Sequence, residues 1–344
     1  MRFPLRPLAA LLLPAALSAQ ERQVLTGTTA TIYNLAGLVR LEPGSGSDVV
    51  VEVSRRGRDA EKLEVRLRGG QLVVRYPATE IVYREDDRED RWGNSSNLRV
   101  REDGTFGDEW ADGGRRTVIR SRGTGLEAHA DLVVKVPAGK RVELHLAAGQ
   151  VEAANVNGDL DVDVYSASVR ATGTKGRLFI DAGSGSVRVA DASGELEIDT
   201  GSGSTTLEGL RMSSVKVDAG SGSVEARDVE AARFSVDVGS GSVRAERLST
   251  DDLLVDTGSG GVRLDLAKVP RRSGIDTGSG SVALGLPDGA AADLDIDTGS
   301  GGISSDFPVT ADSFERRELR GRIGGGGPLI KVSTGSGGVT LRKR

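Results

Sequence analysis

The stretch Ile275-Asp276-Thr277-Gly278-Ser279-Gly280-Ser281-Val282 is the clearest copy of a phrase that returns many times along the chain. Each copy has an aliphatic residue, then Asp-x-Gly-Ser-Gly followed by Ser or Gly, and usually another aliphatic residue. The Asp falls at 181, 199, 218, 237, 256, 276 and 297, so successive copies lie 18 to 21 residues apart. A degenerate copy lies at Asp163, a fainter one at His145, and a last one has Ser333 in place of Asp. A period of this length predicts stacked coils rather than a conventional globular core.

Between the copies, aliphatic and charged side chains alternate. Val187 and Val189 flank Arg188, and Leu196 and Ile198 repeat the pattern later in the same coil. Because successive side chains of a strand point to opposite faces, the aliphatic residues face inward and the charged residues face solvent. The sequence therefore predicts an all-β fold. We expect a β-solenoid with coils of about 18–21 residues, two short strands per coil, and a divergent β cap at its N-terminal end.

The composition agrees with a narrow solenoid. Glycine is abundant, with 48 residues, whereas aromatic residues make up only 3%, so the core must be filled by small aliphatic side chains. The net charge is −5, with both signs interspersed, and a nucleic-acid partner is not expected because it would need a concentrated basic face. The chain has no cysteine, which excludes disulfides and thiolate metal sites.

The N-terminus predicts export. Arg2 and Arg6 precede an apolar run at 8–17 and the small residues Ser18 and Ala19, as in a secretory signal peptide covering residues 1–19. No later segment approaches the length of apolar residues that crosses a bilayer as a helix, so we expect no transmembrane segment in the mature chain. Periplasm, cell surface and secretion all remain open as the location.

The strand rhythm divides the chain into further regions. Residues 20–79 alternate in short runs and are expected to form the N-terminal β cap with early coils. Residues 80–116 carry 11 acidic residues and 7 arginines, which predicts a polar, mobile insertion. The solenoid is expected over 117–303, an irregular insertion over 304–327, and a final coil over 328–344.

The recurring aspartates are the first candidate site. They would form a column with a spacing of about 4.8 Å, and like charges that close repel. Each carboxylate could accept hydrogen bonds from the amides of its own turn, as in an Asx turn, which is the interpretation we favour. Alternatively the column could bind Ca²⁺, a cation that prefers oxygen ligands, and no other cofactor is expected. The residues concerned are Asp181, Asp199, Asp218, Asp237, Asp256, Asp276 and Asp297.

Catalytic patterns are weak. Asp-Thr-Gly-Ser at 199, 256, 276 and 297 matches the local motif of aspartic proteases, but those enzymes pair two such loops across a cleft, whereas here the phrase recurs on one face. The only histidines are His129 and His145. Trp92 and Trp110 are the best ligand-contact candidates, because aromatic side chains stack on sugars or partner proteins. The alternative, which is the interpretation we favour, is that Trp92 and Trp110, with Tyr83 and Phe106, form a small cluster that pins the insertion to the cap.

The phrase Ile/Val-Asp-Thr-Gly-Ser-Gly-Ser/Gly-Val, behind a signal peptide and an alternating N-terminal region, resembles the bacterial "putative adhesin" family of exported β-solenoid proteins. The resemblance implies a non-enzymatic envelope or surface protein that binds a surface, a glycan or a protein partner, including further copies of itself. It implies no catalytic residues. Two alternatives stay open: a polysaccharide lyase or hydrolase built on a β-helix, and a regulatory partner in envelope stress.

Overall fold

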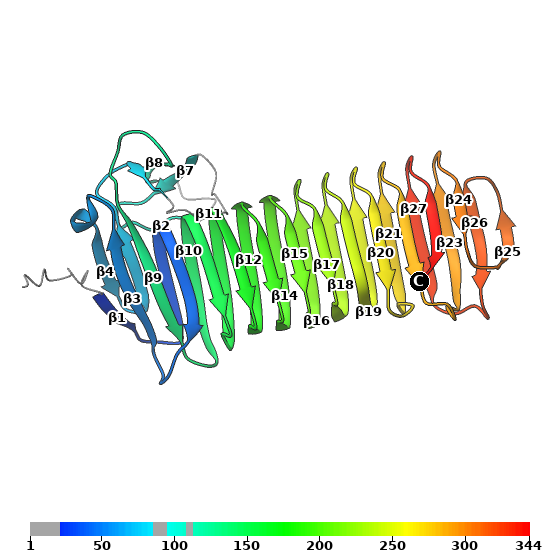
Figure 1. The fold of residues 1–344 in the computed structure, drawn as a ribbon, viewed down its shortest axis with the longest axis horizontal. Helices are drawn as coiled ribbons and strands as arrows, with labels where there is room; N and C mark the ends of the chain where they lie inside the picture. The colour runs from blue at the N-terminus through cyan, green and yellow to red at the C-terminus, as the bar shows by residue number, and fades with distance from the viewer. Residues whose placement is uncertain (1–20, 85–94, 108–112) are drawn as a thin grey trace, which may run out of the picture.

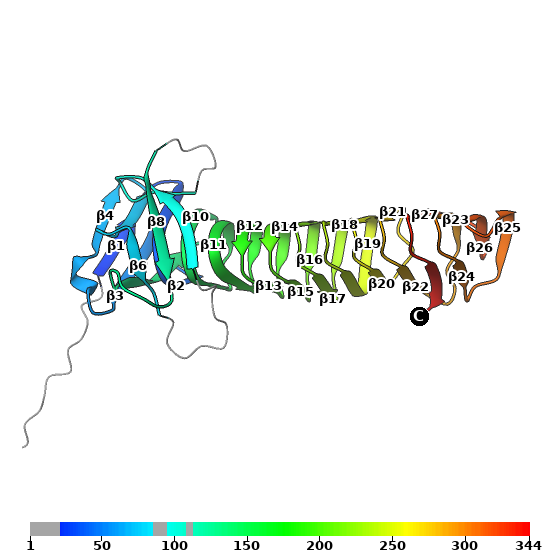
Figure 2. The same cartoon turned by 90° about the horizontal axis from the view of Figure 1, so that it is seen from above.

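The alternating pattern folds into a long rod of parallel coils. The computed structural model describes residues 21–84, 95–107 and 113–344, and in this part of the chain 25 strands form one continuous sheet and three more form a small separate sheet. The described residues contain a single 3-10 turn, η1 (Ala60–Lys62), and no α-helix. Figures 1 and 2 show a broad N-terminal cap followed by a narrow shaft. The fold is thus all-β and of the solenoid type, as the repeat predicted.

The first coil is β2 (Thr29–Pro43), and its partner in the shaft is far away in the sequence. It pairs in parallel with β10 (Lys140–Ala154), for example through Leu144 opposite Ile32. Strands β3 to β9, which lie between β2 and β10 in the sequence, belong to the cap, and so does β1, which precedes β2. The cap contains β1 (Glu21–Leu25), β3 (Val49–Arg56), β4 (Glu64–Arg68), β5 (Gln71–Arg75), β6 (Glu80–Val82), β7 (Ser95–Val100), β8 (Arg115–Arg120) and β9 (His129–Val136).

The cap closes the open edge of β2. Strands β5 and β9 continue the parallel ladder on that edge, and β4 and β3 then add antiparallel strands outside them. Strand β1 pairs antiparallel with β3. Unpaired strand edges are prone to aggregation, so a change to antiparallel pairing with short strands is an effective stop for a parallel stack.

The shaft consists of two stacked rows of strands per coil. Leu196 pairs with Leu178 of the preceding coil and Val215 of the next, and all three are buried. The residues that alternate with them face solvent, so each coil contributes its aliphatic side chains to one continuous core. The shaft strands are β11 (Gly158–Thr172), β12 (Lys175–Ser184), β13 (Val187–Ala190), β14 (Ser193–Ser202), β15 (Thr205–Glu208), β16 (Arg211–Ala219), β17 (Val224–Arg227), β18 (Glu230–Val238), β19 (Val243–Thr257), β20 (Val262–Leu266), β21 (Arg272–Thr277), β22 (Val282–Leu286), β23 (Ala292–Thr298) and β24 (Ile303–Ser305).

The last coil in the sequence is not the last coil in space. Strand β27 (Leu329–Thr334) lies between β21 and β23 and pairs in parallel with both. In the same way β28 (Val339–Lys343) lies between β22 and β24. Figure 1 shows the red β27 between the yellow β21 and the orange β23. The final coil expected over 328–344 exists, but it intercalates between two earlier coils.

Residues 304–327 are not irregular, contrary to the prediction. They contain β25 (Val309–Phe314) and β26 (Glu318–Ile323), which form an antiparallel pair, and β26 also pairs antiparallel with β23. An ion pair of 3.4 Å between Arg320 and Asp295 supports this pairing. The segment lacks the repeat motif because it caps the C-terminal end of the stack, where another parallel coil would leave a new edge exposed.

The described part of the 80–116 insertion, residues 80–84, 95–107 and 113–116, forms strands, and the rest of the segment predicted to be mobile lies outside the described residues. Strands β6 and β7 flank β8 in the small sheet. Ile81, Leu98, Phe106 and Ile119 are buried in a second apolar cluster against the first coils. The region is rich in charged residues, but its few inward-facing apolar residues are sufficient to pack the small sheet against the first coils. The predicted signal peptide, residues 1–19, lies outside the described residues.

Candidate functional site

The aspartates form the predicted column, and the fold extends it at both ends. Parallel pairing places each Asp directly opposite its counterpart in the next coil, and Ser333 lies opposite both Asp276 and Asp297. At the N-terminal end the column continues through Asp163 and His145 to Tyr33. The members that match the repeat are Asp181, Asp199, Asp218, Asp237, Asp256, Asp276 and Asp297.

In the copies at Thr257, Thr277 and Thr298, the residue after the Asp makes a hydrogen bond within the turn, whereas the buried Thr200 hydroxyl has no partner among the described residues. The buried Thr257 hydroxyl donates to the Gly260 carbonyl at 2.8 Å, and the Thr298 hydroxyl donates to the Gly301 carbonyl at 2.8 Å. The Thr277 hydroxyl also accepts the Gly280 amide at 2.9 Å. Within the described residues, no turn amide donates to the carboxylate of Asp256. At Asp256 the Asx-turn interpretation is therefore wrong, because the hydroxyl of the neighbouring Thr257 makes the hydrogen bond within that turn.

The column is acidic along a shallow hollow of about 370 Å³. Lys216 and Lys331 lie toward its ends, and the exposed Leu254 lies between them, where Gly274 leaves space in the next coil. Partial burial, together with repulsion from Asp237 and Asp276, raises the pKa of the Asp256 carboxyl. The free energy of the folded state is therefore raised when the whole column is ionised.

The carboxylates form a row and not a cage. Among the residues that the structure describes, no group of three or more His, Cys, Asp or Glu side chains converges so as to hold a metal ion. Calcium binding by the column stays a prediction, and an ion there would be shared between carboxylates of successive coils.

The aromatic candidates divide into two groups. Trp92 and Trp110 lie outside the described residues. Tyr83 and Phe106 are buried, and the Phe106 ring meets the Tyr33 ring edge-on at 5.7 Å between centroids. These two side chains pin the insertion to the first coils.

At the position of the Asp in the coil of β10, the column has the imidazole ring of His145 instead of a carboxylate. It stacks on Tyr33, with 4.3 Å between ring centroids and 3° between planes, and its Nδ1 lies 2.9 Å from Oδ2 of Asp163. The segment at Phe106 and Gly107 packs over this pair, since a Cβ on Gly107 would lie 2.7 Å from the Asp163 carboxylate. The insertion therefore covers the N-terminal end of the column.

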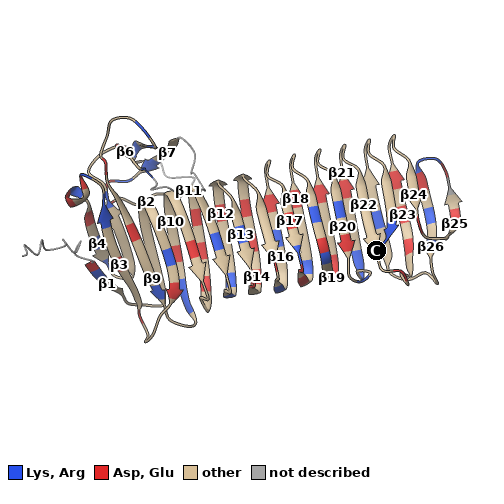
Figure 3. Ribbon diagram, in the orientation of Figure 1, with Lys and Arg blue, Asp and Glu red and all other residues tan. Residues whose placement is uncertain are grey.

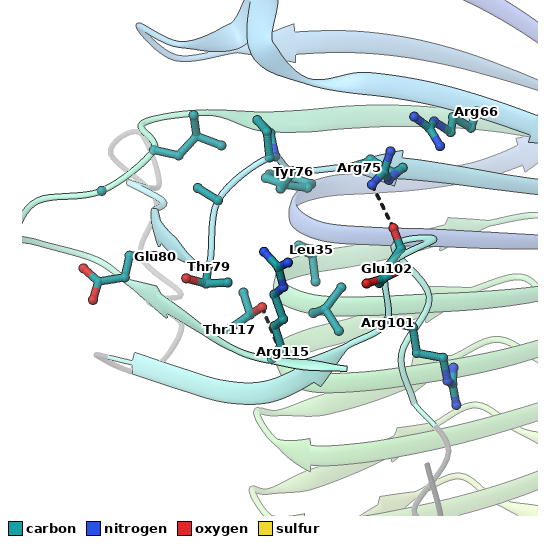
Figure 4. Close-up of a pocket in the computed structure, with 15 residues that line it drawn as sticks. Leu35, Arg66, Arg75, Tyr76, Thr79, Glu80, Arg101, Glu102, Arg115 and Thr117 are labelled. Carbon is teal, nitrogen blue, oxygen red and sulfur yellow. Dashed lines mark hydrogen bonds between the residues drawn. The ribbon is translucent and has the colours of Figure 1, made fainter. Parts of the chain in front are cut away.

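A larger depression lies in the cap, between the small sheet and the strands that close β2. Its volume is about 870 Å³, and we call it the cap cleft (Figure 4). Arginines reach it from four different segments: Arg66 from β4, Arg75 from β5, Arg101 from the turn after β7, and Arg115 from β8. The full lining is Leu35, Arg66, Arg75, Tyr76, Pro77, Ala78, Thr79, Glu80, Val100, Arg101, Glu102, Arg115, Thr117, Gly125 and Leu126.

Sequence analysis did not find this cleft. Its arginines are spread over about fifty residues and share no motif, and the only local signal was the density of charge after residue 80. Their convergence depends on the antiparallel pairing of β4 with β5 and on the small sheet, and no sequence repeat predicts either of these features.

A solved structure from Clostridium sporogenes, described as a "putative cell adhesion protein", aligns over 95% of this chain and 100% of its own, with 9% sequence identity and a TM-score of 0.19. No curated protein matches the chain significantly. A search for membrane-crossing helices within the described residues found none of sufficient length and hydropathy.

The family comparison covers most of the shaft. The model of the Toastrack DUF4097 family matches residues 128–342, from the start of β9 through the intercalated coil. The matched segment begins after the last residue that lines the cap cleft, Leu126. Since the match spans more than half of its length, the chain belongs to the Toastrack DUF4097 family.

Proposed function

We propose that the protein is an exported, non-enzymatic scaffold of the cell envelope or cell surface, which binds a surface, a glycan or a protein partner. The proposal rests on the charged side chains along the shaft, which form ion pairs with one another between successive coils. Arg188 binds Glu208 at 2.6 Å, and Lys216 binds Glu197 at 2.9 Å, each pair joining successive coils. Figure 3 shows acidic and basic residues interspersed along the whole shaft.

These pairs suit a rod whose exterior stabilises its own stack. Each exposed pair contributes little, about 0–1 kcal/mol, but the same geometry recurs from coil to coil and favours a straight, rigid shaft. A rigid shaft holds the cap at a fixed distance from whatever anchors the other end. Such a role needs surfaces of defined shape rather than reacting groups.

The test is the location of the protein in intact cells. We would treat whole cells with protease and detect the shaft with an antibody, using a periplasmic and a cytoplasmic protein as controls. Loss of signal from whole cells is expected for a surface protein, and loss only after the outer barrier is opened would place the scaffold in the periplasm. Protection in both conditions, like the cytoplasmic control, would refute export. Turnover of any member of a polysaccharide panel by the purified chain would refute the non-enzymatic role.

A further inference from the structure

The cap cleft carries more positive than negative charge. Its lining has four arginines against two glutamates, Glu80 and Glu102. Glu64 lies beside the cleft and is shared by two of the arginines, at 2.7 Å from Arg66 and 3.3 Å from Arg75. One carboxylate cannot neutralise two guanidinium groups, so the cleft retains a positive excess that favours an anionic ligand.

Arg115 is the arginine best placed to bind a ligand. Its side chain is exposed and has no acidic partner among the described residues. Figure 4 shows it rising from β8 into the cleft, between Thr79 and Leu35, whereas Arg101 points away from the middle. An arginine presents a planar fork of donors that matches a carboxylate in a bidentate manner, and here that fork is available.

The floor under Arg115 is rigid and partly apolar. Leu35 and Leu126 are buried, and Tyr76 lies beside them. The Tyr76 hydroxyl donates to Oδ1 of Asn34 at 2.9 Å and lies 3.0 Å from the Ala36 carbonyl oxygen, and burial raises the pKa of this phenol well above its usual range. The ring is therefore neutral and fixed, and a ligand would meet a preformed surface with a low ordering cost.

We propose that the cap cleft binds an acidic saccharide that carries carboxylate groups, a class exemplified by polyuronates. Arg115 would bind a sugar carboxylate, and Arg75, whose Nη2 is held by the Glu102 carbonyl at 2.8 Å, would contribute a second positive charge. Glu80 and the Thr79 hydroxyl, both exposed on the lining, would accept and exchange hydrogen bonds with sugar hydroxyls. This inference deepens the proposed binding function and rests on it.

The mixture of charges favours a saccharide over an acidic peptide. Two carboxylates line the cleft beside the arginines, and they would repel the closely spaced acidic side chains of such a peptide. A uronate unit has one carboxylate and several neutral hydroxyl donors, which can satisfy both the arginines and the glutamates. Because the cleft lies outside the region that matches the family, this specificity would belong to the cap of this chain and not to the shared shaft.

The test is a calorimetric titration of the full chain. The probes are trigalacturonate, the neutral trisaccharide maltotriose, and a triglutamate peptide at the same ionic strength. We expect trigalacturonate to bind and the other two to bind at least tenfold more weakly. The variant Arg115→Gln should weaken trigalacturonate binding about tenfold, because it removes a bidentate, charge-assisted hydrogen bond to a sugar carboxylate. Arg75→Gln should weaken it as well.

The matched control is Arg263→Gln, an exposed arginine on the shaft without an ion pair among the described residues. It should leave binding unchanged, and unfolding curves should show that all variants are folded. Absence of trigalacturonate binding, equal loss in Arg115→Gln and Arg263→Gln, or tighter binding of triglutamate would each overturn the proposal. Export with binding to cells that is unaffected by Arg115→Gln would refute the cleft while leaving the scaffold function intact.

Discussion

The replacement Gly260→Ala should destabilise the shaft strongly, although it adds only one methyl group. The turns of successive coils stack so closely that a Cβ on Gly260 would lie 1.7 Å from the carbonyl oxygen of Gly241 in the preceding coil. The next residue provides a matched control. A Cβ on Gly261 would lie 3.6 Å from the Ser281 carbonyl oxygen, which is an ordinary contact, and neither glycine has a positive φ that would exclude alanine by itself.

The magnitude follows from the spacing of the coils. Relief of the clash requires a local separation of more than about 1 Å between coils that stack about 4.8 Å apart. That movement would break the nearest hydrogen bonds between these coils, from the Gly258 amide to the Val238 carbonyl and from the Val243 amide to the Gly261 carbonyl, both 3.0 Å. Two net backbone bonds at about 1 kcal/mol each, with about 1–3 kcal/mol for overpacking, give a loss of about 3–5 kcal/mol.

Urea unfolding followed by circular dichroism would measure both variants against the natural chain. Gly260→Ala should lower the free energy of unfolding by about 3–5 kcal/mol, whereas Gly261→Ala should change it by less than about 0.5 kcal/mol. Equal midpoints for the two variants would show that the turns can separate freely and that the close stacking of Gly260 on Gly241 does not limit stability.

Three further predictions concern the column and the core. Ser333→Asp should place a carboxylate between Asp276 and Asp297 and lower the urea midpoint at low salt; Ser333→Asn is the control, and an effect that persists at about 1 M salt would contradict repulsion. The pKa of the Asp256 carboxyl is raised in the folded state, so its ionisation lowers the stability of the fold as the pH rises through that pKa. Asp256→Asn should therefore raise the melting temperature at neutral pH and leave it unchanged below pH 3.8. Equal shifts of the melting temperature at both pH values would refute this linkage. Val236→Asp should cost more than about 4 kcal/mol, since the carboxylate would be buried without a partner; a thermal unfolding curve that barely moves would reverse the inward assignment of this strand.

The architecture of the shaft could be predicted from the sequence because one rule repeats. Alternation sets which side chains face inward, and the spacing of the Asp-x-Gly-Ser-Gly phrase sets the register from coil to coil. The structure confirms both at Asp181 and Asp199, which lie directly opposite each other, and at the buried Leu196 and Ile198.

The order of the coils could not be predicted, for a physical reason. Every copy of a repeat presents the same edge, so β21 can pair with the following coil or with a later one without any change in local sequence. Ser333 pairs with Asp276, which precedes it by 57 residues, rather than with Asp297 alone. The 36-residue gap before Ser333 was the only signal, and it was compatible with a simple insertion.

The structure of the cap could not be predicted for a different reason. The high charge of residues 80–116 predicts a mobile insertion, yet in its described part Ile81, Leu98 and Phe106 suffice to pack a small sheet against the first coils. A satellite core of this kind depends on the surface it covers, which composition alone does not describe. The same packing creates the cap cleft, so the most specific surface of the molecule lies where the sequence pattern is least regular.

The intercalated coil explains how the two ends of the rod come to differ. In a simple solenoid the chain terminus forms the last coil, which has one free edge and frays first. Here β28 pairs with β22 on one edge and with β24 on the other, so residues 339–341 are paired on both edges inside the stack. The hairpin of β25 and β26 pairs antiparallel with the outer edge of β23 and so closes this ladder of parallel strands. The C-terminal end of the stack is thus closed by antiparallel strands. The cap end carries a cleft whose Arg115 has no acidic partner among the described residues, and the saccharide proposed above would bind there.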